Sequence, residues 1–157
     1  QAAWLEGHIA RANSHHAQWT EKQPVLVIFN GPDAYVSPSW YGNVQNVPTW
    51  NYIVVHVRGI LHKEDEPSAK DDLLKRLIAH LEPSYAQHWR GLAADYQQRM
   101  LQAIVGFKIK IHSIEGKFKL SQNRLPADVK GILEAYAAGN EKQRALAVWM
   151  KRIRDEL

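Results

Sequence analysis

Three short stretches of the chain carry the side chains that a ligand with a flat ring and an anionic tail would need. They are GHIARAN (residues 7–13), VPTWNY (residues 47–52) and EGKFKLSQNR (residues 115–124). Each places amide, hydroxyl, basic or aromatic groups near the end of an apolar segment. Aromatic faces cover a ring, amides satisfy its polar edges, and cations with backbone N–H groups hold an anion. Flavin mononucleotide (FMN) is a ligand with both features.

Each of these side chains also has an ordinary structural interpretation. Trp50 could be a core aromatic residue, Asn51 and Asn123 could form turns, and Arg11 could be a surface ion-pair partner. Lys117 could lie on the solvent-facing side of a strand. The ligand interpretation therefore depends on the three stretches occurring together in one chain.

Other chemistries find little support in the sequence. No G-x-S-x-G segment provides a nucleophilic serine, so no catalytic residue is identified. The chain has no cysteine, and its histidines lack the i, i+4 spacing that directs two imidazoles at one ion, so no metal site is expected. A G-x-G-x-x-G fingerprint and a P-loop are both absent, which leaves a Rossmann-type or nucleotide-hydrolysing protein without support.

Length and composition predict a single domain that spans residues 1–157. This length allows one hydrophobic core, and the apolar share of 45% includes no run long enough to span a bilayer, so no membrane partner is expected. The lack of cysteine and of a visible signal peptide predicts a cytoplasmic protein. The net charge of +4 is spread along the chain and supports DNA binding only weakly.

The elements that must position the three stretches are strands in the first half of the chain. Residues 25–29 (VLVIF) are apolar on both alternating faces, so a helix or a second subunit must cover the face that the domain itself does not. Residues 53–57 (IVVHV) place three apolar side chains on one face, which we expect in the core. A further strand alternates over residues 107–111 and is expected to end in a turn at Gly116.

Helical periodicity appears in mid-chain and near the carboxyl terminus. Ser68 is expected to cap a mid-chain helix with a stripe of leucines. The part from about residue 125 to 157 is expected to be helical, with Pro126 at a first helical position. Asn140 and Gln143 have the spacing of a capping box, which begins the last helix.

Segments along essentially the whole chain carry a resemblance to a known family. They are GHIARAN (Gly7–Asn13), VLVIFNGPDAYVSPSWY (Val25–Tyr41), VPTWNYIVVHVRG (Val47–Gly59), IVGFKIKI (Ile104–Ile111) and EGKFKLSQNR (Glu115–Arg124). In this order they closely resemble the PaiB-type family of negative transcriptional regulators, within the FMN-binding split-barrel superfamily. The combination of VPTWNY with KLSQN is specific to that pattern.

The resemblance implies a fold, a partner and a cofactor. The fold class is mainly β with helices (α+β), an FMN-binding split β-barrel of six strands with a helical C-terminal part. The family pattern implies a homodimer that binds FMN in the groove between its subunits. A second subunit would explain why residues 25–29 are apolar on both faces.

The resemblance also implies which residues hold FMN. HIARAN would approach the phosphate and the ribityl chain, and Trp50 and Asn51 would face the ring after Pro48 sets the entry into the strand. KFKLSQN would reach across from the partner subunit. The cofactor-binding residues implied in this way are His8, Ala10, Arg11, Asn13, Trp50, Asn51, Lys117, Gln122 and Asn123.

The chain departs from the family pattern in two places. A helix and a strand hairpin that usually precede GHIARAN, and that supply part of the flavin site, are not in this sequence. The stretch over residues 42–46 is also shorter than the pattern leads us to expect. A barrel without the hairpin would have an open edge.

Two functions follow from the resemblance. The first is an FMN-binding negative transcriptional regulator, and the alternative is a flavin-dependent oxidoreductase or flavin reductase, in which the cofactor carries the hydride. Ala135 and Gly139 have the spacing of a helix-turn-helix, but Glu134 and Asn140 stand where that motif needs apolar residues. Gly139 fits better as the end of a helix, so regulation that does not involve direct DNA binding is also open.

Overall fold

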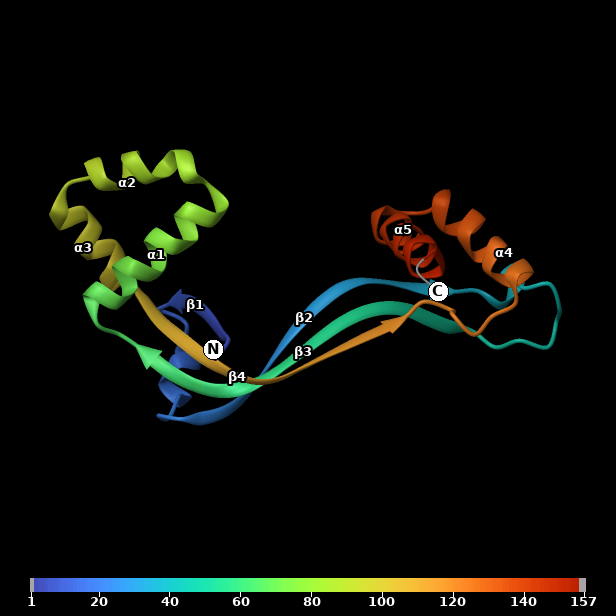
Figure 1. Ribbon diagram of the computed structural model, residues 1–157, viewed down its shortest axis with the longest axis horizontal. Coiled ribbons are helices and arrows are strands. Elements are labelled where there is room, and N and C mark those ends of the chain that lie inside the picture. The colour runs from blue at the N-terminus through green and yellow to red at the C-terminus, as the bar shows by residue number, and fades with distance from the viewer. Residues whose placement is uncertain (1, 156–157) are drawn as a thin grey trace. The chain divides into compact units, whose positions relative to one another are not determined.

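The computed structural model describes residues 2–155, which form two compact units (Figure 1). Unit 1 contains residues 2–26 and 57–113, and unit 2 contains residues 27–56 and 114–155. The prediction of a single domain stays a prediction.

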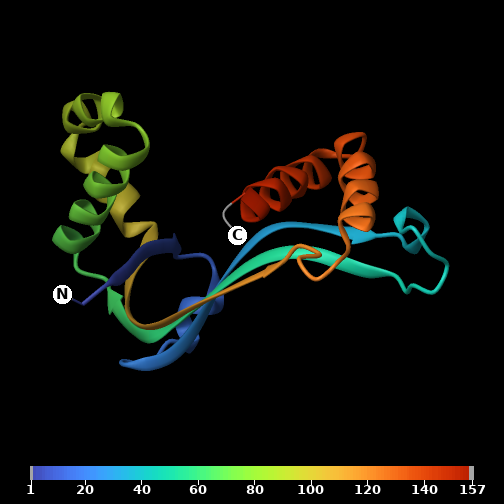
Figure 2. The ribbon, with the colours of Figure 1, turned by 45° about the vertical axis from the view of Figure 1, so that its right-hand side comes forward.

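A four-stranded sheet runs through the described residues, with the strand order β1-β4-β3-β2 (Figures 1 and 2). β1 pairs antiparallel with β4, and Gly7 lies opposite Phe107. A Cβ atom at Gly7 would lie 2.7 Å from the Phe107 ring, so a glycine is needed where this ring crosses β1. The strands are β1 (Trp4–Ala10), β2 (Gln23–Val36), β3 (Thr49–Glu64) and β4 (Ile104–Lys119).

Strand β4 is longer than the sequence predicts. It continues through Gly116 to Lys119, so the predicted turn at Gly116 is wrong. Gly116 does not have a positive φ angle, and the strand continues through the residues on both sides of it. The described residues form four strands, where the family resemblance implies six.

In unit 1, helices follow β3 and lead into β4 (Figure 1). The first helix begins at Pro67, with Glu66 as its N-cap, so the predicted cap at Ser68 is wrong. Proline suits this first helical position because its missing N–H has no partner there in any case. The helices of this unit are α1 (Pro67–Leu81), α2 (Ala86–Gly91) and α3 (Ala94–Gln102), with short 3-10 turns η1 (Ser14–Gln18) and η3 (Pro83–Tyr85).

In unit 2, the 3-10 turn η2 (Pro38–Trp40) follows β2, and two helices follow β4: α4 (Pro126–Ala137) and α5 (Glu141–Asp155). Pro126 stands at the start of α4 as predicted. The capping box is confirmed, because Gln143 N–H donates to Asn140 Oδ1 at 3.0 Å and Asn140 N–H donates to Gln143 Oε1 at 2.9 Å.

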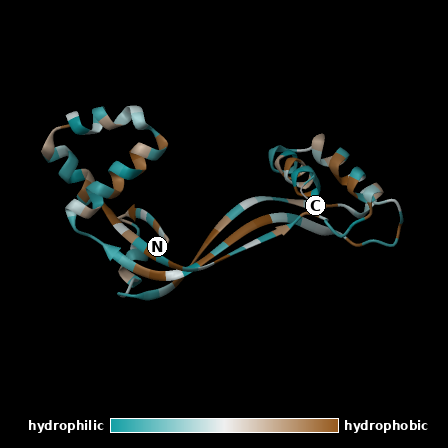
Figure 3. Ribbon diagram, viewed as in Figure 1, coloured by the Kyte–Doolittle hydropathy of each residue, from teal (hydrophilic) through white to brown (hydrophobic). Residues whose placement is uncertain are grey.

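The core of unit 2 lies where α4 and α5 pack on strand residues. Its fully buried side chains include Val36, Leu120, Ile132, Tyr136 and Leu146. Figure 3 shows apolar residues along both β2 and β3, and Val36 of β2 and Ile53 of β3 belong to this core. Among the described residues, no helix is long and apolar enough to cross a membrane.

Candidate functional site

The nine predicted site residues fall into two groups, one in each unit. His8, Ala10, Arg11 and Asn13 belong to unit 1. Trp50, Asn51, Lys117, Gln122 and Asn123 belong to unit 2. Each group is therefore built from its own unit.

The unit 1 group lies at the end of β1 and in the turn that follows. His8 and Ala10 are exposed on β1. Asn13 accepts a hydrogen bond from His15 N–H at 3.0 Å and thereby caps the 3-10 turn η1. The His16 ring nitrogen Nε2 lies 2.8 Å from the Arg11 carbonyl oxygen and holds the same turn. The segment is consequently well ordered by its own side chains.

Arg11 is the most firmly held side chain of this group. Its Nε donates to the Gln102 carbonyl at 2.7 Å, and its Nη2 donates to the Ile104 carbonyl at 3.1 Å and to Asp65 Oδ1 at 2.5 Å. Asp65 also receives a hydrogen bond from Lys70, whose side chain is buried, at 3.1 Å. The sequence allowed a surface ion pair for Arg11, and the structure contains one.

The charge of Asp65 follows from these partners. The hydrogen bond from Arg11 lowers the pKa of the Asp65 carboxyl below its ordinary value, and Lys70 acts in the same direction against the opposing effect of burial. Asp65 is thus a carboxylate at neutral pH. Arg11 keeps about two fifths of its side chain exposed, 42%, while its guanidinium is held in one orientation.

In unit 2, Trp50 lies on the solvent-facing side of β3. Its side chain is 51% exposed, and it meets Tyr35 of β2 edge to face with ring centroids 6.1 Å apart. The alternation of β3 puts Tyr52 and Val54 on the same side as Trp50. The core interpretation of Trp50 therefore does not describe this structure, and an open aromatic face remains.

Asn51 points to the opposite side of β3 and is fully buried, with 0% exposed. Its Oδ1 accepts a hydrogen bond from Ser121 Oγ at 2.9 Å, and its Nδ2 lies 3.7 Å from Met150 Sδ. The buried Tyr136 hydroxyl donates to the Ala34 carbonyl at 3.2 Å, and burial raises the pKa of this phenol. Asn51 belongs to the polar part of the core of unit 2.

The remaining predicted residues of unit 2 lie at the end of β4. Gln122 closes the turn after β4, since its Oε1 accepts from Leu120 N–H at 2.8 Å and its Nε2 donates to the Phe118 carbonyl at 2.6 Å. Lys117 and Asn123 are exposed. The structure thus brings Asn51 next to the turn that carries Gln122 and Asn123, while Trp50 faces away from Asn51.

A hollow of about 640 Å³ lies over β2 and β3 in unit 2. Its volume lies within the range of small-molecule sites. Sequence reasoning missed two residues that line it, Asp33 and Lys142, which form an ion pair at 2.5 Å. They are 109 positions apart, so no local pattern could have paired them. The lining residues are Asn30, Gly31, Asp33, Tyr52, Ile53, Val54 and Lys142.

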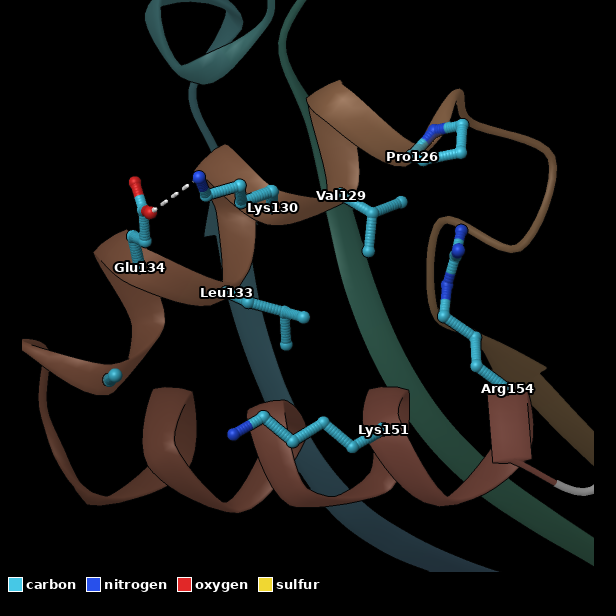
Figure 4. A pocket seen from close by; sticks show the side chains of 8 residues that line it. Pro126, Val129, Lys130, Leu133, Glu134, Lys151 and Arg154 are labelled. Atoms are coloured by element: carbon cyan, nitrogen blue, oxygen red, sulfur yellow. Dashed lines mark ion pairs between the residues drawn. The ribbon is translucent and has the colours of Figure 1, made fainter.

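A second hollow of about 370 Å³ lies between α4 and α5 (Figure 4). Val129 and Leu133 point from α4 toward α5, and Lys151 and Arg154 line the α5 side (Figure 4). Its lining contains neither an aromatic ring nor an amide side chain, so it does not suit a planar heteroaromatic ligand. Among the described residues, no group of His, Cys, Asp and Glu could hold a metal ion.

The donor groups of each unit, taken separately, suit one part of FMN by their chemistry. Unit 2 offers an open indole on β3, and a phenol and an amide in the lining of the hollow of suitable size, which match the faces and polar edges of a flavin ring. Unit 1 offers an oriented guanidinium beside exposed His8 and backbone groups, which match a phosphate.

Comparison with known proteins agrees with this chemistry. The fold resembles that of the flavocytochrome Anf3 from Azotobacter vinelandii, with a TM-score of 0.54 and 16% identity over 73% of this chain and 50% of that chain. The predicted fold class, an α+β split barrel with a helical C-terminal part, is thereby confirmed. Residues 1–113 match the family described as "Putative FMN-binding domain", and the chain belongs to this family.

Two relatives extend the comparison. The chain is 39% identical over 137 residues to "Protease synthase and sporulation protein PAI 2" of Bacillus subtilis, which covers 83% of this chain and 63% of that protein. It is 29% identical to an uncharacterized protein of Aspergillus fumigatus, over 84% of this chain and 65% of that protein. The predicted family is therefore confirmed. The chain spans less than two thirds of the length of these relatives.

Proposed function

We propose that the chain binds FMN as a homodimer in the cytoplasm and takes part in the negative regulation of transcription. The proposal rests on membership of the FMN-binding family and on the similarity to PAI 2. The single observation that supports the cofactor most directly is the open indole of Trp50, which is about half exposed on β3.

The ring site would use the solvent-facing side of β3. An indole that is half exposed next to Tyr35 offers an aromatic surface, and flat rings gain from stacking or edge-to-face contact with such a surface. Lys117 and Asn123 would contribute a cation and an amide to the edges of the ligand. Asn51 is buried and already hydrogen-bonded, which does not favour direct contact with the ring.

The phosphate site would use the segment from His8 to Asn13. Arg11 is held by two carbonyls and by Asp65, so less side-chain entropy would be lost when it orders an anion. FMN, when bound, supplies a ring that accepts and returns electrons. The chain would bind the cofactor, orient it and shield one of its faces from water.

A homodimer is supported by large apolar side chains that unit 2 leaves open on β2 and β3. Ile28, Phe29, Tyr35 and Trp50 are each about half exposed. Soluble monomers seldom leave large apolar side chains open in such numbers on neighbouring strands, and a symmetric partner would cover them. The same partner would complete the groove in which the resemblance implies that FMN binds.

Direct DNA binding receives less support than indirect regulation. The capping box at Asn140 and Gln143 begins α5 directly after Gly139, so this boundary follows the chemistry of a helix start. A regulator that binds flavin can instead act by responding to the redox state of its ligand. PAI 2 is a longer protein, of which the matched part of this chain covers 63%.

Two measurements on the purified protein test the proposal. The purified protein is titrated with FMN, and flavin fluorescence quenching gives the affinity while light scattering gives the mass. We expect saturable quenching and the mass of a dimer. Quenching that never saturates would refute FMN binding. Rapid bleaching of the bound flavin by NADH or NADPH, with turnover, would instead favour the flavin-dependent oxidoreductase.

A further inference from the structure

Two side-chain hydrogen bonds join the start of β3 to the end of β4 and its following turn, all within unit 2. Ser121 Oγ donates to Asn51 Oδ1 at 2.9 Å, and Lys119 Nζ donates to Thr49 Oγ1. In both bonds the partners are 70 positions apart, and Thr49 and Asn51 are alternate residues on one side of β3. They act as a clamp between VPTWNY and KLSQN.

The turn held by this clamp has an unusual backbone. Ser121 has a φ of 58°, in the left-handed region that favours glycine. A residue other than glycine keeps such a conformation only where its surroundings enforce it, and such residues gather at functional sites. Here Arg124 N–H donates to the Ser121 carbonyl at 3.1 Å, and Gln122 bonds the backbone on the other side.

Packing alone does not explain this polar pair. Asn51 has 0% and Ser121 has 7% of its surface exposed, so both polar groups are removed from water. Replacing both partners of a buried hydrogen bond by apolar groups is often neutral or stabilising, so the pair contributes little that an apolar core would lack. What an apolar pair cannot do is hold one turn at one orientation, because dispersion contacts are not directional.

We propose that Asn51 and Ser121 are positioning residues for the FMN site, and that neither contacts the ligand. Asn51 is the immediate neighbour of Trp50, and Ser121 lies two residues before Asn123. The bond between them fixes the backbone that carries the indole relative to the backbone that carries the amide, so the affinity for a ligand that uses both would depend on it. This inference rests on the proposed function and reassigns Asn51 from the ligand to its support.

The test is a double variant in which the buried Asn51–Ser121 pair becomes apolar, Asn51→Leu with Ser121→Gly. Leucine has nearly the shape of asparagine, and glycine accepts the left-handed backbone at position 121 without strain. We expect a melting temperature close to that of the wild type and an FMN dissociation constant raised about tenfold, which corresponds to about 1.4 kcal/mol. Ser39→Ala, which removes an exposed hydroxyl of the same unit, is the matched control and should change neither quantity.

Coupling to Asn123 separates positioning from a purely structural role. Asn123→Ala should weaken FMN binding in the wild type and have little further effect in the double variant, where the turn is already misplaced. Equal effects of Asn123→Ala in both backgrounds would overturn the proposal, as would an unchanged FMN affinity in a folded double variant.

Thr49→Val provides a second route if the double variant does not fold. It removes the bond from Lys119 at the less buried end of the clamp, and it too should raise the FMN dissociation constant. Unchanged affinity in this variant would count against the clamp. A wild-type protein that does not bind FMN at all would refute the proposed function, whereas a wild type that binds, with variants that bind equally well, would refute this inference alone.

Discussion

Replacing Trp50 by alanine separates a ligand role from a packing role. The indole is 51% exposed, so the substitution removes only about half of the burial that a core tryptophan provides. We expect a loss of roughly 1–2 kcal/mol in the free energy of unfolding, against about 3–5 kcal/mol for a fully buried aromatic. For a chain of this size that loss lowers the melting temperature by roughly 2–8 °C.

Relative to the modest loss of stability, the loss of FMN affinity should be large. A stacked or edge-to-face aromatic contact contributes about 0.5–1.5 kcal/mol beyond its buried area, and the area itself adds to this. Trp50→Ala should therefore raise the FMN dissociation constant by about tenfold or more. Trp50→Phe keeps a ring at this position and should recover part of the affinity.

The assay is FMN titration by fluorescence quenching, with thermal unfolding measured in the presence and absence of FMN. Trp89→Ala is the control, because this indole is 8% exposed and donates to Asp71 at 3.4 Å in unit 1. It should lose about 3–5 kcal/mol of stability, and FMN affinity measured well below its melting temperature should stay the same. The reasoning is refuted if Trp50→Ala behaves like Trp89→Ala, with a large loss of stability and unchanged affinity.

Three further predictions concern the partner and the titrating groups. Ile28→Glu should convert the dimer to a folded monomer in light scattering, because it puts a charge on the open apolar surface; a wild-type monomer would contradict this. The folded-state pKa of Asp65 lies below its usual value of 3.8 because Arg11 donates to it, so its stabilisation is present above that value and is lost as the pH falls through the folded pKa. Asp65→Asn should accordingly flatten the acid side of the melting-temperature profile. Tyr136→Phe removes the hydrogen bond to the Ala34 carbonyl and should cost about 1 kcal/mol, and an unchanged melting temperature would show that this bond contributes nothing.

Local signals in the sequence were sufficient for much of the fold. The capping box at Asn140 and Gln143 and the proline at position 126 need only a few neighbouring residues, and both are confirmed. The alternation over residues 53–57 correctly placed Ile53 and Val57 among the buried residues, because strand periodicity is a property of the chain itself, whereas Val55 is only half-buried. Residues 25–29 are apolar on both faces, which indicated that a helix or a second subunit must cover one face of this strand. Three of these residues remain about half exposed.

Where prediction failed, two local signals competed or the partner lay far away along the chain. The glycine at position 116 predicts a turn, yet β4 continues through it in an extended conformation. Asp33 meets Lys142 across 109 positions and Asn51 meets Ser121 across 70, and a single sequence contains no signal that links such pairs. Their contacts follow from how α5 and the end of β4 pack, which only the folded chain defines.

The mixture of residues in VPTWNY has a physical explanation in the geometry of one strand. Successive residues of a strand point to opposite sides, so Trp50 and Asn51 cannot share one flat pocket unless the backbone turns between them. β3 does not turn there, and it leaves the indole half open while Asn51 is buried against Ser121. A stretch that must both present a ring and fix its orientation needs an aromatic residue on one side and a directional hydrogen-bonding group on the other. An aliphatic residue at position 51 would preserve the core, but it would leave the orientation of the neighbouring turn unspecified.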